Sequence, residues 1–378
     1  MREIIALISS GKIFTKSIKM DTYNDLNWNG IYKKGSNSII WPKSPLVETE
    51  KIRVSDDVFA RLEKSYQLAY EHDTHKYPQS KWWTNMTKQF KETFFTENNR
   101  LRIEKLRNFR CEKSADTEII TQQLSIVSKE RGYFRSYLNS IKVVLEYHRL
   151  SSIVRKEILA SLSESYAGNN YCPIYRGQRL STALLKHCIY LSGILNNINF
   201  SENKRNVILE IGGAYGGLLR TVKNYVPDSC CINIELPEMC VLSGYFLAYC
   251  FPKFKIGFLS DVLDALKTKK ISEVINKYDF LVLPTWSIEY FPNKSSDLIV
   301  NTVSLGEMSN EYGEFYIKNI NRVLRQRGYF YSVNRTSSTE VEKYDDFGFF
   351  NWQFIDDYNT VSYKYLPIGH PEWIGRKK

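Results

Sequence analysis

The sequence predicts an α/β protein in which a mainly α-helical N-terminal domain (1–165) precedes a domain built on a mostly parallel β-sheet (166–378). Before residue 165, apolar residues recur at three- and four-residue steps, which indicates helices with one buried face. After residue 200, apolar runs of four to six residues alternate with helical segments. Such alternation is typical of parallel strands that helices cover on both faces of the sheet.

The charge distribution also separates the two parts. Residues 1–200 contain 31 Lys and Arg against 20 Asp and Glu, whereas residues 201–378 contain 21 of each. The net charge of +11 therefore lies in the first part. We expect this part to face an anionic partner, such as a nucleotide-linked substrate, a lipid phosphate, a membrane surface or nucleic acid. A basic surface that serves only solubility explains the same numbers.

The overall composition is that of an ordinary globular protein. Of the 378 residues, 43% are hydrophobic and 25% are charged, which argues against a fibrous, disordered or membrane-spanning chain. Seven cysteines without a Cys-x-x-Cys pair indicate reduced thiols, and Met1–Met20 lacks the long apolar stretch of a secretion signal. We therefore expect a cytoplasmic protein.

Helices are predicted in order along the N-terminal region. Ser55 and the two aspartates after it can cap a helix whose apolar residues begin at Val58. Residues 21–55 have weak periodicity and are expected to be irregular. Further helices are predicted over 86–108, 116–128, 131–149 and 151–164.

A break at Ala167–Asn170 and Pro173 precedes a strongly apolar helix that begins near Leu180. The period of the apolar residues then changes from that of helices to that of short buried strands. The predicted strands are Val207–Ile211, Cys231–Glu235, Phe280–Leu283, Leu298–Asn301 and Tyr329–Val333, with a helix over 311–326 before the last of them.

Glycines cluster where the first strand of the predicted sheet ends, since residues 210–217 read Glu-Ile-Gly-Gly-Ala-Tyr-Gly-Gly. Glycines at a strand-to-helix turn let the backbone turn sharply and let a ligand approach its amides. As Gly-x-Ala-x-x-Gly, the segment fits the pyrophosphate of a dinucleotide. As Glu-x-Gly-x-Ala-x-Gly, it fits the first motif of class I S-adenosylmethionine-dependent enzymes.

Two acids bear on this choice of cofactor. Glu235 ends the next strand, 23 residues after Gly212, and is placed to bind ribose hydroxyls in either case. Glu210 favours S-adenosyl-L-methionine, because a carboxylate repels a pyrophosphate but attracts a sulfonium and an ammonium group. The predicted cofactor-binding residues are Glu210, Gly212, Gly213, Ala214, Tyr215, Gly216, Glu235 and Leu236.

Four segments, in order, resemble the sugar O-methyltransferase family of bacterial natural-product and surface-polysaccharide gene clusters: Glu210–Leu218, Ile234–Met239, Asp297–Met308 and Tyr331–Arg335. The resemblance covers about residues 160–340, and Asn-Thr-x-Ser-x-x-Glu-Met at 301–308 is its most specific part. It implies a Rossmann-like class I methyltransferase domain that methylates a hydroxyl of a surface polysaccharide, a nucleotide sugar or a natural-product glycan. The family usually has Gly in place of Ala214 and Asp in place of Glu235.

Methyl transfer from a sulfonium to a hydroxyl requires in-line alignment, exclusion of water and removal of one proton. Asn301 at the end of its strand, and Ser304 and Glu307 directly after it, are expected beside the cofactor sulfur. We predict Glu307 as the general base, which requires surroundings that raise its pKa. A first-turn carboxylate that only orders its loop is the alternative role for Glu307. His370, on a loop flanked by Gly and Pro, is the rival base.

No metal site is predicted, because His72, Asp73 and His75 lack a further ligand at metal-binding spacing. Asp297 or Glu307 would be the candidates if the reaction used magnesium. The expected partner is a sugar or glycan acceptor, which the basic half could hold through a linked phosphate, and Trp82 and Trp83 are candidates to stack on its rings.

Other classes of function stay open at this point. An RNA methyltransferase would use the basic charge, but the sequence contains no recognisable RNA-binding module, so we expect no nucleic-acid partner. An NAD(P)-dependent Rossmann oxidoreductase would use the same glycines, and a non-catalytic module is a third alternative. A homo-oligomer is compatible with the sequence, which does not specify its order.

Overall fold

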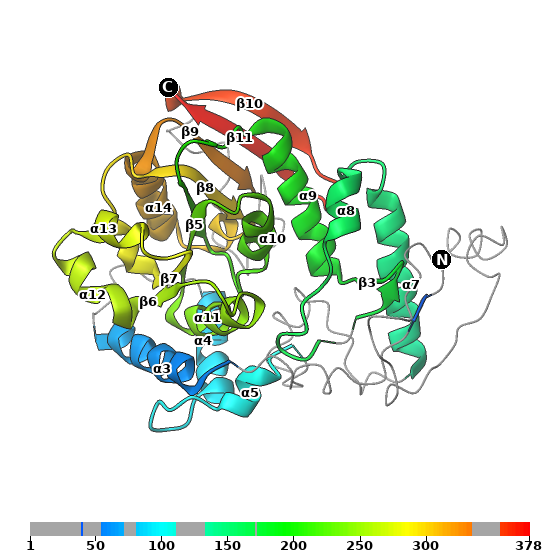
Figure 1. The fold of residues 1–378 in the computed structure, drawn as a ribbon, viewed down its shortest axis with the longest axis horizontal. Coiled ribbons are helices and arrows are strands. Elements are labelled where there is room, and N and C mark those ends of the chain that lie inside the picture. Colours follow the sequence, from blue (N-terminus) through cyan, green and yellow to red (C-terminus); the bar gives the residue numbers. More distant parts are fainter. Residues whose placement is uncertain (1–38, 41–53, 72–80, 111–132, 171, 335–355) are drawn as a thin grey trace. The chain divides into compact units, whose positions relative to one another are not determined.

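A computed structural model describes residues 39–40, 54–71, 81–110, 133–170, 172–334 and 356–378 (Figure 1). Its contacts group the chain into two compact units. The first unit contains the described residues of 1–52, 108–113 and 118–189, and the second contains those of 53–107 and 190–378. The division predicted at residues 165 and 166, with an acceptor-binding or oligomerising first part, stays a prediction.

The second unit is built on an eight-stranded sheet with the order β10-β11-β9-β8-β4-β5-β7-β6. Strands β4 to β9 pair in parallel, whereas β11 is antiparallel to both β9 and β10. This mostly parallel sheet, alternating with helices, confirms the predicted Rossmann-like α/β fold class. The strands are β4 (Asn206–Ile211), β5 (Ser229–Glu235), β6 (Ile256–Phe258), β7 (Phe280–Pro284), β8 (Ser296–Thr302), β9 (Leu324–Val333), β10 (Tyr358–Tyr365) and β11 (Pro371–Lys377).

The order of the strands positions the ligand-binding edge. From β4 the chain moves to β5 on one side, and later returns to β8 on the other side of β4. Right-handed crossovers in opposite directions place the helices after β4 and β8 on opposite faces and open a crevice at the carboxyl ends of these two strands. The helices and 3₁₀ turns are α9 (Thr182–Asn197), α10 (Gly217–Tyr225), α11 (Pro237–Cys250), α12 (Leu259–Lys267), α13 (Ile271–Ile275), η3 (Thr285–Tyr290), η4 (Leu305–Glu307) and α14 (Asn310–Val323).

One face of the sheet carries the main apolar core. Alternate residues of β4 and β5, such as Leu209, Ile211, Ile232 and Ile234, are completely buried against α12, α13 and α14. The residues between them, including Glu210 and its neighbour in register Asn233, therefore face the other side of the sheet. The period-two pattern thus separates an apolar face from one that contains polar side chains.

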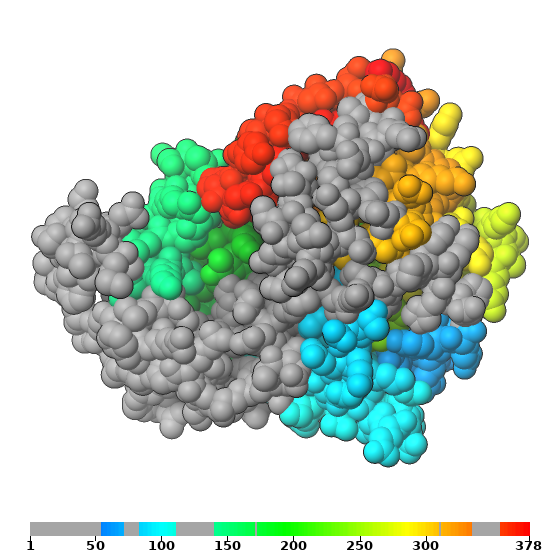
Figure 2. All heavy atoms as spheres, turned by 180° about the vertical axis from the view of Figure 1, so that it is seen from behind, coloured from blue at the N-terminus to red at the C-terminus, as the bar shows by residue number. Residues whose placement is uncertain are grey.

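Helices from the N-terminal sequence belong to the same unit as the sheet. Helix α3 (Asp56–Glu71) stacks Phe59 on Tyr245 of α11, and Arg61 forms an ion pair of 2.8 Å with Asp261 of α12. The segment follows the lower margin of this unit in Figures 1 and 2, where it is blue to cyan. It continues in α4 (Lys81–Phe94) and α5 (Ile103–Arg107).

Several predicted boundaries are wrong. The helix predicted over 86–108 is divided into α4 and α5 by the bridge between Phe95 and Leu101. The helix predicted over 151–164 is confined to α8 (Lys156–Ser161), and α14 ends at Val323 because β9 begins there. The first unit also contains α7 (Tyr133–Leu150), β1 (Ile39–Ile40), β2 (Ile174–Tyr175) and β3 (Gln178–Arg179), while the helix predicted over 116–128 lies outside the described residues.

In the part of the chain that the structure describes, no helix has the length and the apolar character needed to cross a membrane.

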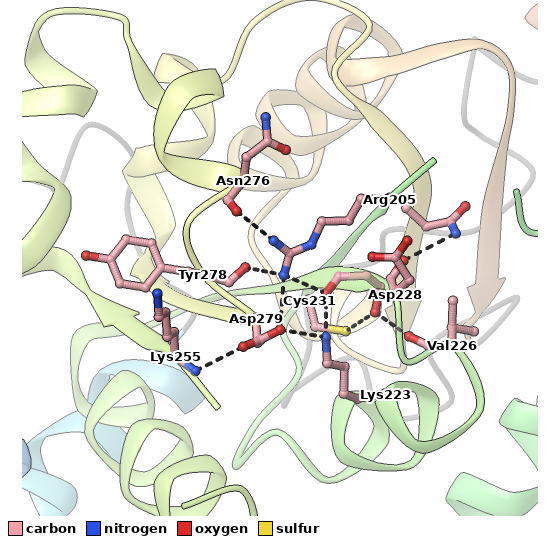
Figure 3. Close-up of polar contacts among 11 residues, drawn as sticks. Arg205, Lys223, Val226, Asp228, Cys231, Lys255, Asn276, Tyr278 and Asp279 are labelled. Carbon is pink, nitrogen blue, oxygen red and sulfur yellow. Dashed lines mark hydrogen bonds and ion pairs between the residues drawn. The ribbon is translucent and has the colours of Figure 1, made fainter. Parts of the chain in front are cut away.

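A polar network ties together the amino ends of β4, β5 and β7 (Figure 3). Asp279, directly before β7, accepts from Arg205 Nη2 at 3.1 Å and from Lys223 Nζ at 3.2 Å. Lys223 also donates to the carbonyl of Ser229, and only 2% of the residue is exposed. A buried ammonium group requires a nearby anion, so Asp279 supplies the charge that lets α10 pack on the sheet.

We predict that Asp279→Ala lowers the free energy of unfolding by roughly 3 kcal/mol, because it leaves the ammonium group of Lys223 buried without a counter-ion. Urea unfolding measures the change. The matched control is Asp264→Ala on the exposed side of α12, which should change stability by less than about 0.5 kcal/mol. Equal effects of the two substitutions on stability would contradict the role of Asp279 as the counter-ion of Lys223.

Candidate functional site

A cavity lies at the carboxyl edge of the sheet, in the crevice that the strand order predicts. It measures about 510 Å³, including the space at its open mouth. Four of the predicted site residues line it: Gly212 after β4, Glu235 and Leu236 after β5, and Ser304 after β8. The structure therefore brings the ends of three strands, far apart in sequence, to one cavity.

The loop after β4 turns through three residues with left-handed backbone. Their φ angles are +70° at Gly212, +48° at Ala214 and +82° at Gly216. A side-chain carbon on Gly212 would lie 2.1 Å from the Oγ of Ser304, so only glycine permits this contact between the two loops. Ala214 takes a conformation that costs an alanine roughly 1 kcal/mol, which accounts for the preference of the resembled family for glycine here.

Glu235 is held rigidly at the cavity. Its Oε1 accepts from the backbone N–H of Ala214 at 2.8 Å, and its Oε2 accepts from its neighbour Leu236 at 2.7 Å. Burial, with a smaller contribution from the charges of Glu307 and Glu238, raises the pKa of Glu235 to about 7, although these two bonds act in the opposite direction. One lone pair on each oxygen remains for a ligand, which suits a pair of adjacent hydroxyls.

Hydrogen bonds from β8 fix the glycine loop. The amide of Asn301 donates to the carbonyl of Ile211 at 2.9 Å, and Ser304 Oγ donates to the same carbonyl at 3.2 Å. Asn301 is completely buried, and its Oδ1 accepts from Asn334 Nδ2 at 2.9 Å. These contacts fit a positioning role, since the side chain of Asn301 is occupied inside the protein.

Val303 is strained at the point where β8 leaves the sheet. Its φ angle is +66°, a left-handed value that is a genuine outlier for a β-branched residue. The bond from its N–H to the carbonyl of Val333, 2.6 Å long, holds it there. Such strain, which costs of order 1–3 kcal/mol, is often retained where it aims functional groups. Here it directs Ser304 and η4, which carries Glu307, back over the cavity edge.

Glu307 lies on η4 with 7% of its surface exposed. Its charge raises the pKa of Glu235, so the two carboxylates are electrostatic neighbours across the loop. Its immediate neighbour Met308 lines the cavity, as does Ser309. Glu307 thus directly precedes two residues that line the cavity and has little contact with solvent, and its contact with a ligand stays a prediction.

Other predicted cofactor residues lie beneath the loop rather than on the cavity wall. Glu210 is 1% exposed and faces α10, where the N–H of Leu219 donates to it. Gly213 packs directly on Glu210, and Tyr215 is buried with its ring edge-on to Phe246 at 4.7 Å. Contact of Glu210, Gly213 and Tyr215 with a cofactor stays a prediction.

His370 lies in the turn between β10 and β11, where its carbonyl accepts from Leu366 at 2.9 Å. This turn is at the carboxyl edge, because β11 is antiparallel to β9. Strands are about 4.8 Å apart, and β11 is three strands from β4, so the turn lies roughly 14 Å along the sheet from the glycine loop. The role of His370 as a base stays a prediction.

Asp297 was named as a candidate magnesium ligand, and the structure places it away from the cavity. It begins β8 at the amino edge of the sheet, opposite the cavity. There it pairs with Lys204 at 2.8 Å and with Arg325 at 2.5 Å, and it accepts from the N–H of Val207. Among the described residues there is no group of three His, Cys, Asp or Glu side chains suited to a metal ion. His72, Asp73 and His75 lie outside the described residues.

Several cavity residues were not predicted as site residues. Tyr312 and Tyr316 of α14, Thr285 at the start of η3 and Met308 form much of its wall. Trp83, which was predicted only as a stacking candidate, reaches the same cavity from α4. Tyr312 and Tyr316 lie four residues apart, which places them on one helix face, but the sequence does not show that this face turns toward the cavity rather than the core.

Comparisons with protein-family models and with curated proteins give no match. Solved structures resemble about half of the chain. A protein from Pyrococcus horikoshii OT3 is 11% identical over 52% of this chain and 92% of its own, with a TM-score of 0.37. A SAM-dependent methyltransferase from Aquifex aeolicus is 12% identical over 50% of this chain and 89% of its own, with a TM-score of 0.33. PigF, solved with SAH, is 15% identical over 50% of this chain and 61% of its own, with a TM-score of 0.32. At these identities the likeness concerns the fold alone.

We predict that Val303→Gly raises the free energy of unfolding by about 1 kcal/mol, because the relief of left-handed strain exceeds the entropy that glycine adds to the unfolded chain. The control is Val361→Gly on the exposed strand β10, which should lower stability by roughly 1 kcal/mol. Thermal or urea unfolding compares them. Similar destabilisation by both would show that Val303 is not strained.

Proposed function

We propose that this protein is an S-adenosylmethionine-dependent O-methyltransferase and that its acceptor is a sugar hydroxyl. The observation that carries the proposal is the position of Glu235. This carboxylate ends β5, is fixed by two backbone N–H groups and faces a cavity against the glycine loop. A carboxylate at this point of a parallel sheet suits the adjacent hydroxyls of a ribose.

The residues present fit this cofactor. Gly212 leaves the loop without a side chain at the cavity, Glu235 offers paired acceptors, and Leu236 offers an apolar surface for a base. Glu235 and Glu307 make the site anionic, which favours a cationic sulfonium. When bound, S-adenosylmethionine supplies the electrophilic methyl group. The same acids disfavour the pyrophosphate of NAD(P).

Glu307 is proposed as the group that removes the proton of the acceptor hydroxyl. It lies on η4 next to the cavity-lining Met308, is 7% exposed and acts electrostatically on Glu235. Asn301 and Ser304 hold the loop on which Glu307 lies, so their role is to position it.

Aromatic side chains support a sugar as the acceptor. Trp83, Tyr312 and Tyr316 line the cavity opposite the strand ends, and aromatic faces pack well on the C–H faces of a sugar ring. Trp83 comes from the N-terminal sequence, which also carries the excess of positive charge. We therefore propose that this sequence contributes to the choice of acceptor and favours one linked to a phosphate, such as a nucleotide sugar.

Transfer of an isotopically labelled methyl group from S-adenosylmethionine to a panel of nucleotide sugars, free sugars and polysaccharide tests this proposal. We expect label in at least one glycan product. Label only in RNA or in a protein acceptor would replace the sugar by another substrate class and leave the cofactor assignment intact.

We predict that Glu235→Ala weakens binding of S-adenosylmethionine by roughly 1–3 kcal/mol, because ribose hydroxyls lose a charged partner. Isothermal titration calorimetry measures it, with Glu273→Ala on exposed α13 as a control that should bind normally. Because the pKa of Glu235 is about 7, the wild-type affinity should also fall as the pH is lowered through 7, where the carboxylate becomes protonated. An affinity unchanged by the substitution would remove Glu235 from the site.

We predict that Glu307→Gln lowers turnover by about 10² to 10⁴ while affinity for S-adenosylmethionine stays within a few fold, since the amide keeps the shape but cannot accept the proton. Steady-state kinetics and calorimetry on one preparation separate the two effects. His370→Ala is the matched variant and should keep most of the turnover. Loss of turnover in His370→Ala alone would make His370 the base, and loss of cofactor binding in Glu307→Gln would support a loop-ordering role.

A further inference from the structure

Two polar side chains lie side by side on neighbouring strands under the glycine loop, away from the wall of the cavity described above. Glu210 on β4 and Asn233 on β5 are neighbours in register, on the face of the sheet that α10 covers. Glu210 is 1% exposed and Asn233 is completely buried. Neither lines the cavity, so their polar groups must be satisfied within the protein.

Both side chains have a buried oxygen that receives no hydrogen bond. These atoms are Glu210 Oε2 and Asn233 Oδ1. Both lie against Gly213, since a side-chain carbon there would be 2.6 Å from the first and 2.4 Å from the second. Asn233 Nδ2 is directed to the carbonyl of Ala214 at 3.4 Å, which leaves Oδ1 on the side of Glu210.

An ionised Glu210 would be costly in this place. A carboxylate only accepts hydrogen bonds, so two acceptors would face each other while one negative charge is buried. The charge of Glu235 raises the pKa of Glu210, and the charge of Glu210 raises the pKa of Tyr190 of α9 and of Cys231 of β5. None of these three groups is a cation. The N–H of Leu219 is the donor that opposes this cost.

We propose that Glu210 keeps a proton on Oε2 at neutral pH and donates it to Asn233 Oδ1, so that the two residues form a neutral clamp under Gly213. This proton satisfies both orphaned oxygens at once. The clamp joins β4 to β5 directly under the loop and, through Asn233 Nδ2, extends to Ala214. Glu210 is then a positioning residue for the glycine loop, and the negative charge of the cavity comes from Glu235 and Glu307.

Burial, together with the charge of Glu235, raises the pKa of Glu210 to about 8. This direction agrees with a carboxyl group that is neutral at pH 7. The competing arrangement rotates the amide of Asn233, so that Nδ2 donates to an ionised Glu210. Asn233 Oδ1 would then face the carbonyl oxygen of Ala214, which is another acceptor, and the charge would stay buried.

Infrared difference spectroscopy of the ligand-free protein at pH 7, wild type minus Glu210→Gln, tests the proton directly. We expect the carbonyl stretch of a protonated carboxylic acid, which disappears in a titration above pH 8. Carboxylate bands alone at pH 7 would overturn the proposal. The spectrum contains no cofactor, so the result does not depend on whether the protein is a methyltransferase.

Conservative substitution gives the second test. Glu210→Gln keeps a donor for Asn233, so affinity for S-adenosylmethionine should stay within about threefold, whereas Glu210→Ala should weaken it at least tenfold. The pKa of Glu210 in the folded protein lies above its ordinary value of about 4.5. The free energy of unfolding should therefore fall as the pH rises from about 4.5 to 8, because Glu210 ionises more readily in the unfolded chain. Glu210→Gln should reduce this slope. A Gln variant that binds as weakly as the Ala variant, with an unchanged slope, would contradict the clamp.

If Glu210→Gln does not fold, Asn233→Ala assigns the same band. Removal of the acceptor should shift the acid carbonyl stretch of the wild type to higher frequency, because the proton loses its partner. A band that Asn233→Ala leaves in place would show that Glu210 does not donate to Asn233.

Discussion

The contact of the β8 loop with the glycine loop is the constraint on which the site depends. The carbonyl of Ile211 accepts from both Asn301 and Ser304, and Gly212 rests on the hydroxyl of Ser304 with no room for a side chain. The backbone of β8 reaches this position only through the left-handed Val303. Two strands adjacent in space but 90 residues apart in sequence are thereby joined at the carboxyl edge of the sheet, beside the cavity.

Buried acids form the second characteristic of this edge. Burial raises the pKa of Glu235 and of Glu238 to about 7 and that of Glu210 to about 8. The three differ in their partners: Glu235 accepts from backbone N–H groups at the cavity, Glu238 accepts from Tyr70 of α3, and Glu210 faces Asn233. The same type of buried side chain thus lies at the cavity, against the N-terminal helices and under the glycine loop.

The sequence was sufficient for the parts of the fold that local pattern determines. Apolar runs located five strands of the sheet, and the glycines and Glu235 located its carboxyl edge, because strand ends and sharp turns have direct residue signatures. It could not assign α3 and α4 to the same unit as the sheet, nor Trp83 to the cavity, since helix periodicity does not say which neighbour covers a face. Asp297 was misleading for the same reason: its partner Arg325 comes from another strand.

The central claim is that the carboxyl edge of this sheet binds S-adenosylmethionine. Calorimetric titration of the unmodified protein with S-adenosylmethionine, S-adenosylhomocysteine, NADH and NADPH on one preparation tests it most directly. We expect saturable one-to-one binding of the first two and no binding of the nicotinamide cofactors. Binding of NADH or NADPH without S-adenosylmethionine would contradict it, as would the absence of binding by all four.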